Sequence, residues 1–140
     1  MKTLKRSLLM ILLLTAVGFL FRGWIYRQLV NYKSVGMRTT YPVRNKNFTQ
    51  YINSCIDNQK QPDIKQIIKL ALAITSEKLT KKKKKNDIDP NKLIISQKAH
   101  CVGYAAFYTT TCNYLLAKNN LSNQWTAKPR IGQLYFFFLI

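Results

Sequence analysis

The strongest hydrophobic feature of the chain is an uncharged, leucine-rich run from Ser7 to Phe21, which follows a basic cluster at residues 2–6. At about 1.5 Å of rise per residue, a helix over this run covers about 22 Å, less than the roughly 30 Å hydrocarbon core of a bilayer. Arg22 can snorkel along its stem, and Trp24–Tyr26 can continue the apolar surface into the interface. The pattern predicts one membrane helix within residues 1–30, retained as a signal anchor.

Two alternatives to a retained anchor stay open. Ala16 and Gly18 supply small residues at a spacing that suits signal-peptide cleavage, and an apolar run can also form the core helix of a soluble protein. Retention is favoured because the run passes Gly18 without a polar region and ends in interfacial aromatic residues. Basic residues lie on both sides of the run, so its orientation in the membrane is open.

After the apolar run the sequence becomes polar and irregular. Gly36 and Pro42 are breakers, which indicates a linker over residues 31–46. Helical periodicity returns over Asn47–Ile56. Its apolar positions are Phe48, Tyr51, Ile52 and Cys55.

The clearest helical pattern runs from Pro62 to Leu79. Pro62 suits the first helical position, and the charge of Asp63 favours the amino-terminal dipole. The predicted apolar face consists of Ile64, Ile67, Ile68, Ala71, Leu72, Thr75 and Leu79. Lysines occupy the opposite side, so we expect a helix that lies on a core.

Charge suggests a different class of partner. The 140 residues include 23 Lys and Arg against 5 Asp and Glu, which gives a formal net charge of +18. Lys81–Lys85 could bind anionic lipid or nucleic acid. No aromatic residues interrupt this run and no nucleic-acid-binding motif surrounds it, so a solvated loop is the simpler interpretation. A basic membrane-associated interaction protein is the alternative function, and we do not expect nucleic acid to be the partner.

The sequence offers little for a metal ion. Asp87 and Asp89 resemble the start of a calcium loop, but no Gly and no distal Glu follow at the required spacing. One His and three Cys are too few for a His-rich centre or a disulfide-stapled scaffold. We expect neither a metal nor a cofactor, and a turn over residues 86–91.

Cys101 opens the next predicted helix. The residues that share a face with it are Ala105, Tyr108, Cys112 and Leu115. Unsatisfied N–H groups and the positive end of the helix dipole stabilise a thiolate in the first turn. A disulfide from Cys101 to Cys112 is excluded, because the two residues would be about 16 Å apart along the helix. The alternative is an inert, buried cysteine.

The motif from His100 to Ala105, His-Cys-Val-Gly-Tyr-Ala, resembles the nucleophile motif of the transglutaminase-like superfamily. Residues 86–91 and 125–138 also look like the membrane-anchored, single-domain members of that superfamily. The resemblance implies an α+β fold and a papain-like role for Cys101 in peptide hydrolysis or acyl transfer to an amine. Ala99 departs from the Gly that many members carry two residues before the cysteine.

The partners that such a nucleophile needs are missing from the sequence. The superfamily supplies a His and an Asp downstream of the cysteine, yet no His, Asp or Glu follows Cys101. His100 is badly placed to act as base, because it is the immediate neighbour of Cys101. The segment 131–140 is predicted to be a strand in which the chain stops. We therefore expect a shortened product that is inactive alone and aggregates through its last residues.

The sequence thus predicts an α+β protein with an anchor at residues 1–30, a linker at 31–46 and a partial transglutaminase-like domain at 47–140. The expected partners are the membrane and, for an active form, a peptide or protein substrate. The oligomeric state is left open.

Overall fold

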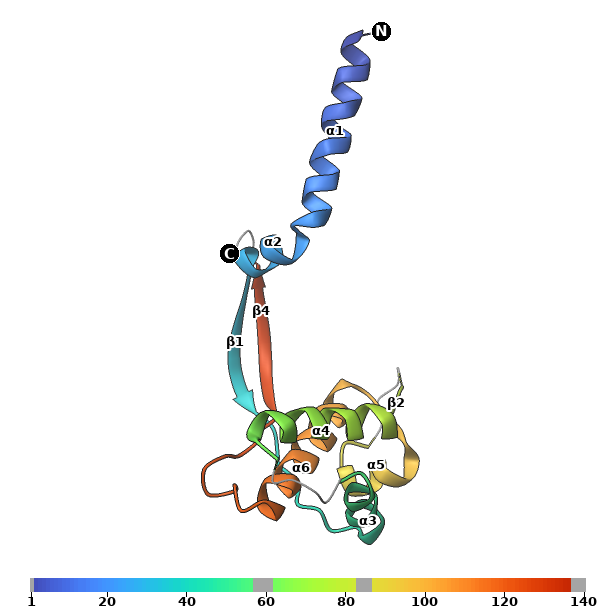
Figure 1. Ribbon diagram of the computed structural model, residues 1–140, viewed down its shortest axis with the longest axis vertical. Helices are drawn as coiled ribbons and strands as arrows, with labels where there is room; N and C mark the ends of the chain where they lie inside the picture. Colours follow the sequence, from blue (N-terminus) through green and yellow to red (C-terminus); the bar gives the residue numbers. More distant parts are fainter. Residues whose placement is uncertain (1, 57–61, 83–86, 137–140) are drawn as a thin grey trace. The chain divides into compact units, whose positions relative to one another are not determined.

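The computed structural model describes residues 2–56, 62–82 and 87–136 and contains both helices and strands, which confirms the α+β class (Figure 1). The chain divides into two compact units. Residues 1–36 and 131–140 form the first, which we call the ribbon unit, and residues 37–130 form the second, the helical unit.

The ribbon unit begins with two helices, α1 (Lys2–Leu20) and α2 (Arg22–Leu29). No single helix among the described residues is long and apolar enough to cross a membrane. Residues 6–29 meet the length and composition criteria only as a pair of helices bent by 59°. The prediction of one continuous helix was therefore wrong: the helix breaks at Phe21, where the apolar run ends and the charged Arg22 begins a second helix.

Strands β1 (Val30–Met37) and β4 (Arg130–Phe136) form a two-stranded sheet, and their arrows point in opposite directions in Figure 1. Tyr32 of β1 covers Gly132 of β4, where an added Cβ would lie only 1.8 Å from the Tyr32 ring. The predicted carboxyl-terminal strand is confirmed to Phe136, while residues 137–140 lie outside the described residues. The predicted linker was wrong over its first half, because pairing with a distant strand has no signal in a local pattern.

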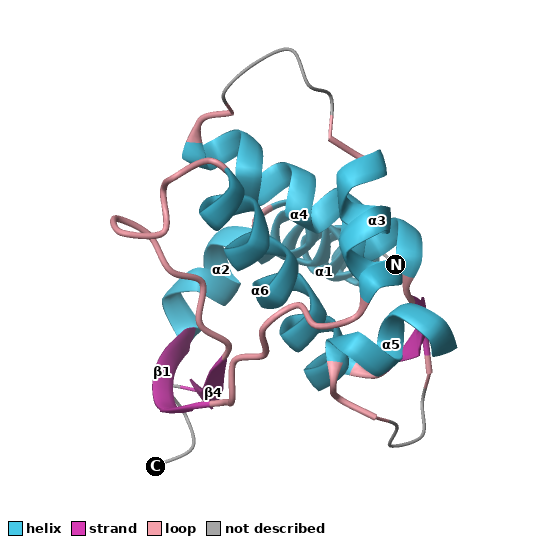
Figure 2. Ribbon diagram, turned by 90° about the horizontal axis from the view of Figure 1, so that it is seen from below, coloured by secondary structure: helices cyan, strands magenta, loops and turns pink. Residues whose placement is uncertain are grey.

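The helical unit contains α3 (Lys46–Ser54), α4 (Ile64–Lys78), α5 (Pro90–Ser96) and α6 (Cys101–Lys118). Two short strands, β2 (Thr80–Lys81) and β3 (Lys98–Ala99), pair in parallel. Helix α6 packs against α4 and α5 (Figure 2). Phe107 of α6 stacks on Phe48 of α3, with ring centroids 4.5 Å apart. The core therefore lies around α6.

Helix α4 confirms the strongest helical prediction but shifts its start and its buried face. Asp63 is the N-cap and forms a capping box with Gln66, so Pro62 lies before the helix and not in its first position. Ile68 and Leu72 were expected in the core but are 43% and 58% exposed, whereas Ile74 is buried. The stripe that faces α6 is rotated from the predicted one, because both stripes satisfy helical spacing.

Candidate functional site

Cys101 is the first residue of α6, and its side chain is exposed. The predicted helix start is confirmed, and the alternative of a buried cysteine was wrong. The predicted common face lies on one continuous helix, but its burial changes along that helix, because Cys112 and Leu115 are buried while Cys101 is not. The middle of α6 is enclosed by other helices, whereas its first residue is not. A nucleophile at this position can meet a substrate.

His100 caps the helix that Cys101 opens. Its Nδ1 accepts the backbone N–H of Gly103 at 3.3 Å, so the imidazole satisfies one of the free donors of the first turn. An Nδ1 that accepts a hydrogen bond leaves the proton of the neutral ring on Nε2. The structure thus gives His100 a capping contact to the backbone, in keeping with the expectation that it is not the base.

Gly103 lets the first turn of α6 approach its neighbours closely. A Cβ added there would lie 3.0 Å from Cδ1 of Leu93 and 3.1 Å from Cβ of Ala99. Both of these residues are fully buried and have little room to move. The glycine of the motif is therefore explained by packing against α5 and β3.

Tyr104 ties the same turn to another helix. Its hydroxyl donates a hydrogen bond to the carbonyl oxygen of Leu79, which is the C-cap residue of α4. His100, Gly103 and Tyr104 all hold the start of α6 in place, while the exposed side chain of Cys101 extends from it. The other residues of the motif thus fix the position of the backbone that carries the Cys101 thiol.

Of the two short parallel strands, β3 leads to Cys101, and β2 pairs with it. The N–H of Thr80 donates to Gln97 O at 2.8 Å, and the N–H of Lys82 donates to Ala99 O at 2.8 Å. Lys81 lies opposite Ala99 in this register, and the side chains of Lys81 and Lys82 are exposed. The beginning of the lysine run therefore lies beside the residues that precede Cys101, an arrangement that the sequence did not reveal. Lys83–Lys85 lie outside the described residues.

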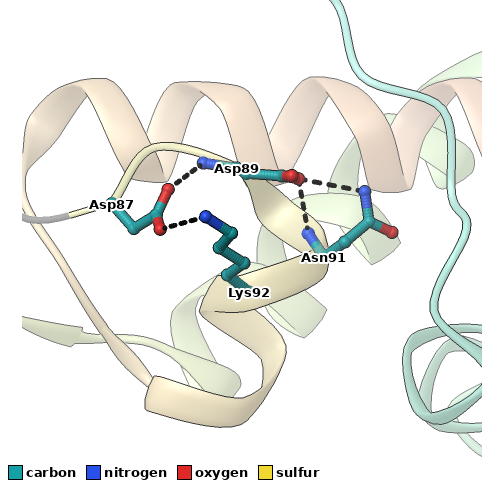
Figure 3. A network of polar contacts seen from close by, with 4 residues as sticks. All are labelled: Asp87, Asp89, Asn91 and Lys92. Carbon is teal, nitrogen blue, oxygen red and sulfur yellow. Dashed lines mark hydrogen bonds and ion pairs between the residues drawn. The ribbon is translucent and has the colours of Figure 1, made fainter.

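The two aspartates of the predicted turn organise the start of α5 (Figure 3). Asp87 Oδ2 lies 3.0 Å from Lys92 Nζ, and Asp87 Oδ1 accepts the N–H of Asp89 at 3.2 Å. These partners, the Asp89 N–H first and Lys92 second, lower the pKa of Asp87. Asp89 Oδ1 accepts both the N–H and the side-chain amide of Asn91, at 2.9 and 3.0 Å. Among the described residues, no group of three or more His, Cys, Asp or Glu could hold a metal ion.

Asn91 has a role that the sequence analysis missed. Its Oδ1 accepts the N–H groups of Arg44 at 2.7 Å and Asn45 at 3.0 Å, and its Nδ2 donates to Pro42 O at 3.1 Å. The side chain thus holds the segment before α3 against α5. Only its place in an Asp-Pro-Asn turn could have drawn attention to it.

A cavity of about 80 Å³ lies beside the first two turns of α6. Its walls include Arg38, Tyr41, Ile88, Val102, Ala106 and Pro129. The N–H of Arg38 donates to Pro129 O at 2.9 Å, and Thr110 Oγ1 donates to Tyr41 O at 3.0 Å. These bonds fix the segment that carries Arg38 next to the turn that follows Cys101.

The other two cysteines differ from Cys101. All three thiols are free, with Cys55 half-buried and Cys112 buried in α6. Burial raises the pKa of Cys112, so its thiol stays protonated and inaccessible at neutral pH. One helix contains both Cys101 and Cys112, which confirms that they do not form a disulfide.

Comparisons of the chain with protein-family models, curated proteins and solved structures find no match. The transglutaminase-like resemblance therefore depends on the residues of the motif. His100 is the only histidine of the sequence, and no carboxylate side chain follows Asp89. Cys101 thus has neither a second imidazole nor a downstream carboxylate in this chain.

Proposed function

We propose that the chain is a membrane-anchored, transglutaminase-like protein related to cysteine peptidases and acyltransferases, with Cys101 as its nucleophile. One observation carries the proposal: Cys101 is the exposed first residue of the helix at the centre of the helical unit. The free N–H groups and the positive end of that helix stabilise a thiolate. The surrounding contacts of His100, Gly103 and Tyr104 hold the turn rigidly.

The chemistry is acyl transfer through a thioester. The Cys101 sulfur attacks an amide carbonyl, the carbon–nitrogen bond breaks, and the amine leaves with a proton. Water or a second amine then attacks the thioester and releases the thiol. The proton transfers need an imidazole positioned against the sulfur, and the only imidazole in this chain caps α6. We therefore expect a reactive thiol without turnover from this chain alone.

Membrane anchoring is part of the same proposal. The apolar side chains of α1, such as Leu8, Leu12 and Leu20, are between 68% and 78% exposed in the structure. Helices α1 and α2 together meet the length and composition requirements of a bent membrane span. Retention of the chain in the membrane pellet after alkaline carbonate washing tests this part.

Alkylation kinetics test the thiol. Cys101 and Cys112 lie in one tryptic peptide, Ala99–Lys118, so a Cys55→Ser, Cys112→Ala chain in detergent is used to isolate Cys101. Exposure alone cannot make a folded thiol faster than the same thiol in the unfolded chain. Stabilisation of a thiolate by a helix terminus, typically about 0.3–1 kcal/mol, predicts about two- to fivefold faster reaction with iodoacetamide at pH 7 in the folded chain than in urea.

A Cys101→Ser change in the same background is the control and must abolish labelling. A second chain that keeps only Cys55 gives the behaviour of a cysteine outside the motif. The proposal fails if Cys101 reacts no faster in the folded chain than in the unfolded one, or if Cys55 shows the same acceleration.

A further inference from the structure

The charges around the start of α6 are unevenly distributed. Lys81 and Lys82 belong to the strand and turn that pair with β3, the strand leading to Cys101. Paired strands lie about 4.8 Å apart, and Ala99 precedes Cys101 by two residues, at most about 7 Å. The two lysine backbones therefore lie within about 12 Å of Cys101. Their exposed side chains can reach a molecule bound at the thiol.

Arg38 adds a cation from a different element. It lines the cavity whose wall also includes Ala106 and Val102, the residue that follows Cys101. Its backbone is fixed by the hydrogen bond to Pro129 O, at 2.9 Å. The thiol thus has basic residues on the segment paired with β3, the strand that precedes it, and in the wall of the cavity beside the turn that follows it.

The nearby carboxylates do not cancel this charge. Asp87 approaches α6 through its backbone, with its carbonyl oxygen 3.5 Å from where a Gly103 Cβ would lie. Its carboxylate is paired with Lys92 at 3.0 Å. Asp89 accepts hydrogen bonds from the neutral Asn91 and keeps its negative charge, but Lys81, Lys82 and Arg38 outnumber this one carboxylate. The described charges near the start of α6 are therefore mainly basic, and at physiological salt such charges act over about 8–10 Å.

We infer that the substrate of Cys101 is an acidic peptide segment, one with Asp or Glu side chains close to the amide that the thiol attacks. The inference rests on the proposed function, because amide chemistry at Cys101 implies a peptide ligand. The basic residues near Cys101 then favour a peptide with acidic side chains. Lys81 and Lys82 provide point charges for carboxylates. Arg38 provides a guanidinium, whose planar shape suits a carboxylate.

Two alkylating reagents of nearly equal size separate charge from reactivity. Iodoacetate is an anion and iodoacetamide is neutral, so their rate ratio at Cys101 reports the local potential. In the folded Cys101-only chain we expect this ratio to be about three- to tenfold higher at low salt than in 1 M NaCl. A Lys81→Gln, Lys82→Gln change should remove most of that gain, and Arg38→Gln part of it.

A matched control uses two lysines of the same unit that are far from the thiol. Lys65 and Lys69 are exposed on α4 and precede its Leu79 end by about 21 and 15 Å of helical rise. The Lys65→Gln, Lys69→Gln chain has the same net charge as the Lys81, Lys82 variant. The inference is overturned if both variants lower the ratio equally, because the effect would then come from overall charge.

Protection experiments identify the ligand class. A glutamate-rich peptide should slow the reaction of Cys101 with iodoacetamide at low salt, and a glutamine-rich peptide of equal length should not. Protection by a single-stranded oligonucleotide without protection by the acidic peptide would overturn the inference. The proposed function has its own separate readout. Cys101 can react faster with iodoacetamide in the folded chain than in the unfolded chain even when it shows no preference for iodoacetate over iodoacetamide.

Discussion

The ribbon unit and the helical unit contain the same kinds of apolar residue in opposite environments. Leu115 of α6 is 1% exposed, whereas Leu12 of α1 is 68% exposed. In the helical unit, the buried side chains extend from Phe48 to Pro129. In the ribbon unit, none of the described side chains is buried. The helical unit supplies its own core, while α1 presents its leucines to the surroundings.

The difference shows where stability and chemistry come from in this protein. Burial of apolar area is the main stabilising contribution to folding, so the helical unit has the means to fold around α6. A two-stranded sheet alone is marginally stable in water, and exposed leucines on a helix favour a lipid environment. Cys101 lies in the helical unit, at the accessible amino-terminal end of its central helix.

The largest test of this contrast replaces one phenylalanine in each unit. Phe107 is fully buried against Phe48, so Phe107→Ala should lower the unfolding free energy by about 3–5 kcal/mol. Phe21 is 54% exposed, and Phe21→Ala should change it by no more than about 0.5 kcal/mol. Urea unfolding of the full chain in detergent, followed by Trp125 fluorescence in a Trp24→Phe background, measures both. Equal losses would show that the two units unfold together.

Neighbouring threonines in α6 provide a finer test, with effects of opposite sign. Thr111 is fully buried, and its hydroxyl has no hydrogen-bond partner among the described residues, so Thr111→Val should stabilise the helical unit by about 1 kcal/mol. Thr110 Oγ1 donates to Tyr41 O at 3.0 Å, and Thr110→Val should destabilise it by about 1 kcal/mol. The same urea titration applies. A stabilising Thr110→Val or a destabilising Thr111→Val would contradict the hydrogen-bond assignment.

The smallest expected effect concerns pH. Asp87 has a pKa below its ordinary value of 3.8, because the N–H of Asp89 and the ammonium of Lys92 favour its charged form. Its contribution to stability is therefore complete above about pH 4 and is lost as the pH falls through the lowered pKa. Unfolding of the wild-type and Asp87→Asn chains between pH 6 and 2.5 should show a difference that shrinks on acidification. The ribbon unit has no carboxylate side chain, so the helicity of α1 should not change. A constant difference across this range would contradict the ion pair.

Local signals in the sequence were enough to predict several elements. The apolar spacing from Ile64 onward indicated α4, although its start was placed at Pro62 and not after Asp63, and the apolar spacing after Cys101 indicated α6. Both helices are decided by groups a few residues apart, which is why the sequence alone sufficed. Asp89-Pro90, by contrast, was expected within a turn, and it is the N-cap and first residue of α5, a helix that was not predicted.

Other features depend on contacts between distant residues. Helical spacing in α4 allowed either Ile68 and Leu72 or Ile74 to be buried, and only packing against α6 selected Ile74. The pairing of β1 with β4, and of Lys82 with Ala99, joins segments that no local pattern connects.

Cys101 shows both kinds of determination. The sequence by itself placed it in the first turn of a helix, because the spacing of apolar residues is a local property of the chain. Its exposure, the close contacts of Gly103 and the basic side chains around it were decided by the tertiary structure. The physical reason is that solvent access and electrostatic potential at a side chain depend on whatever elements the fold brings to it.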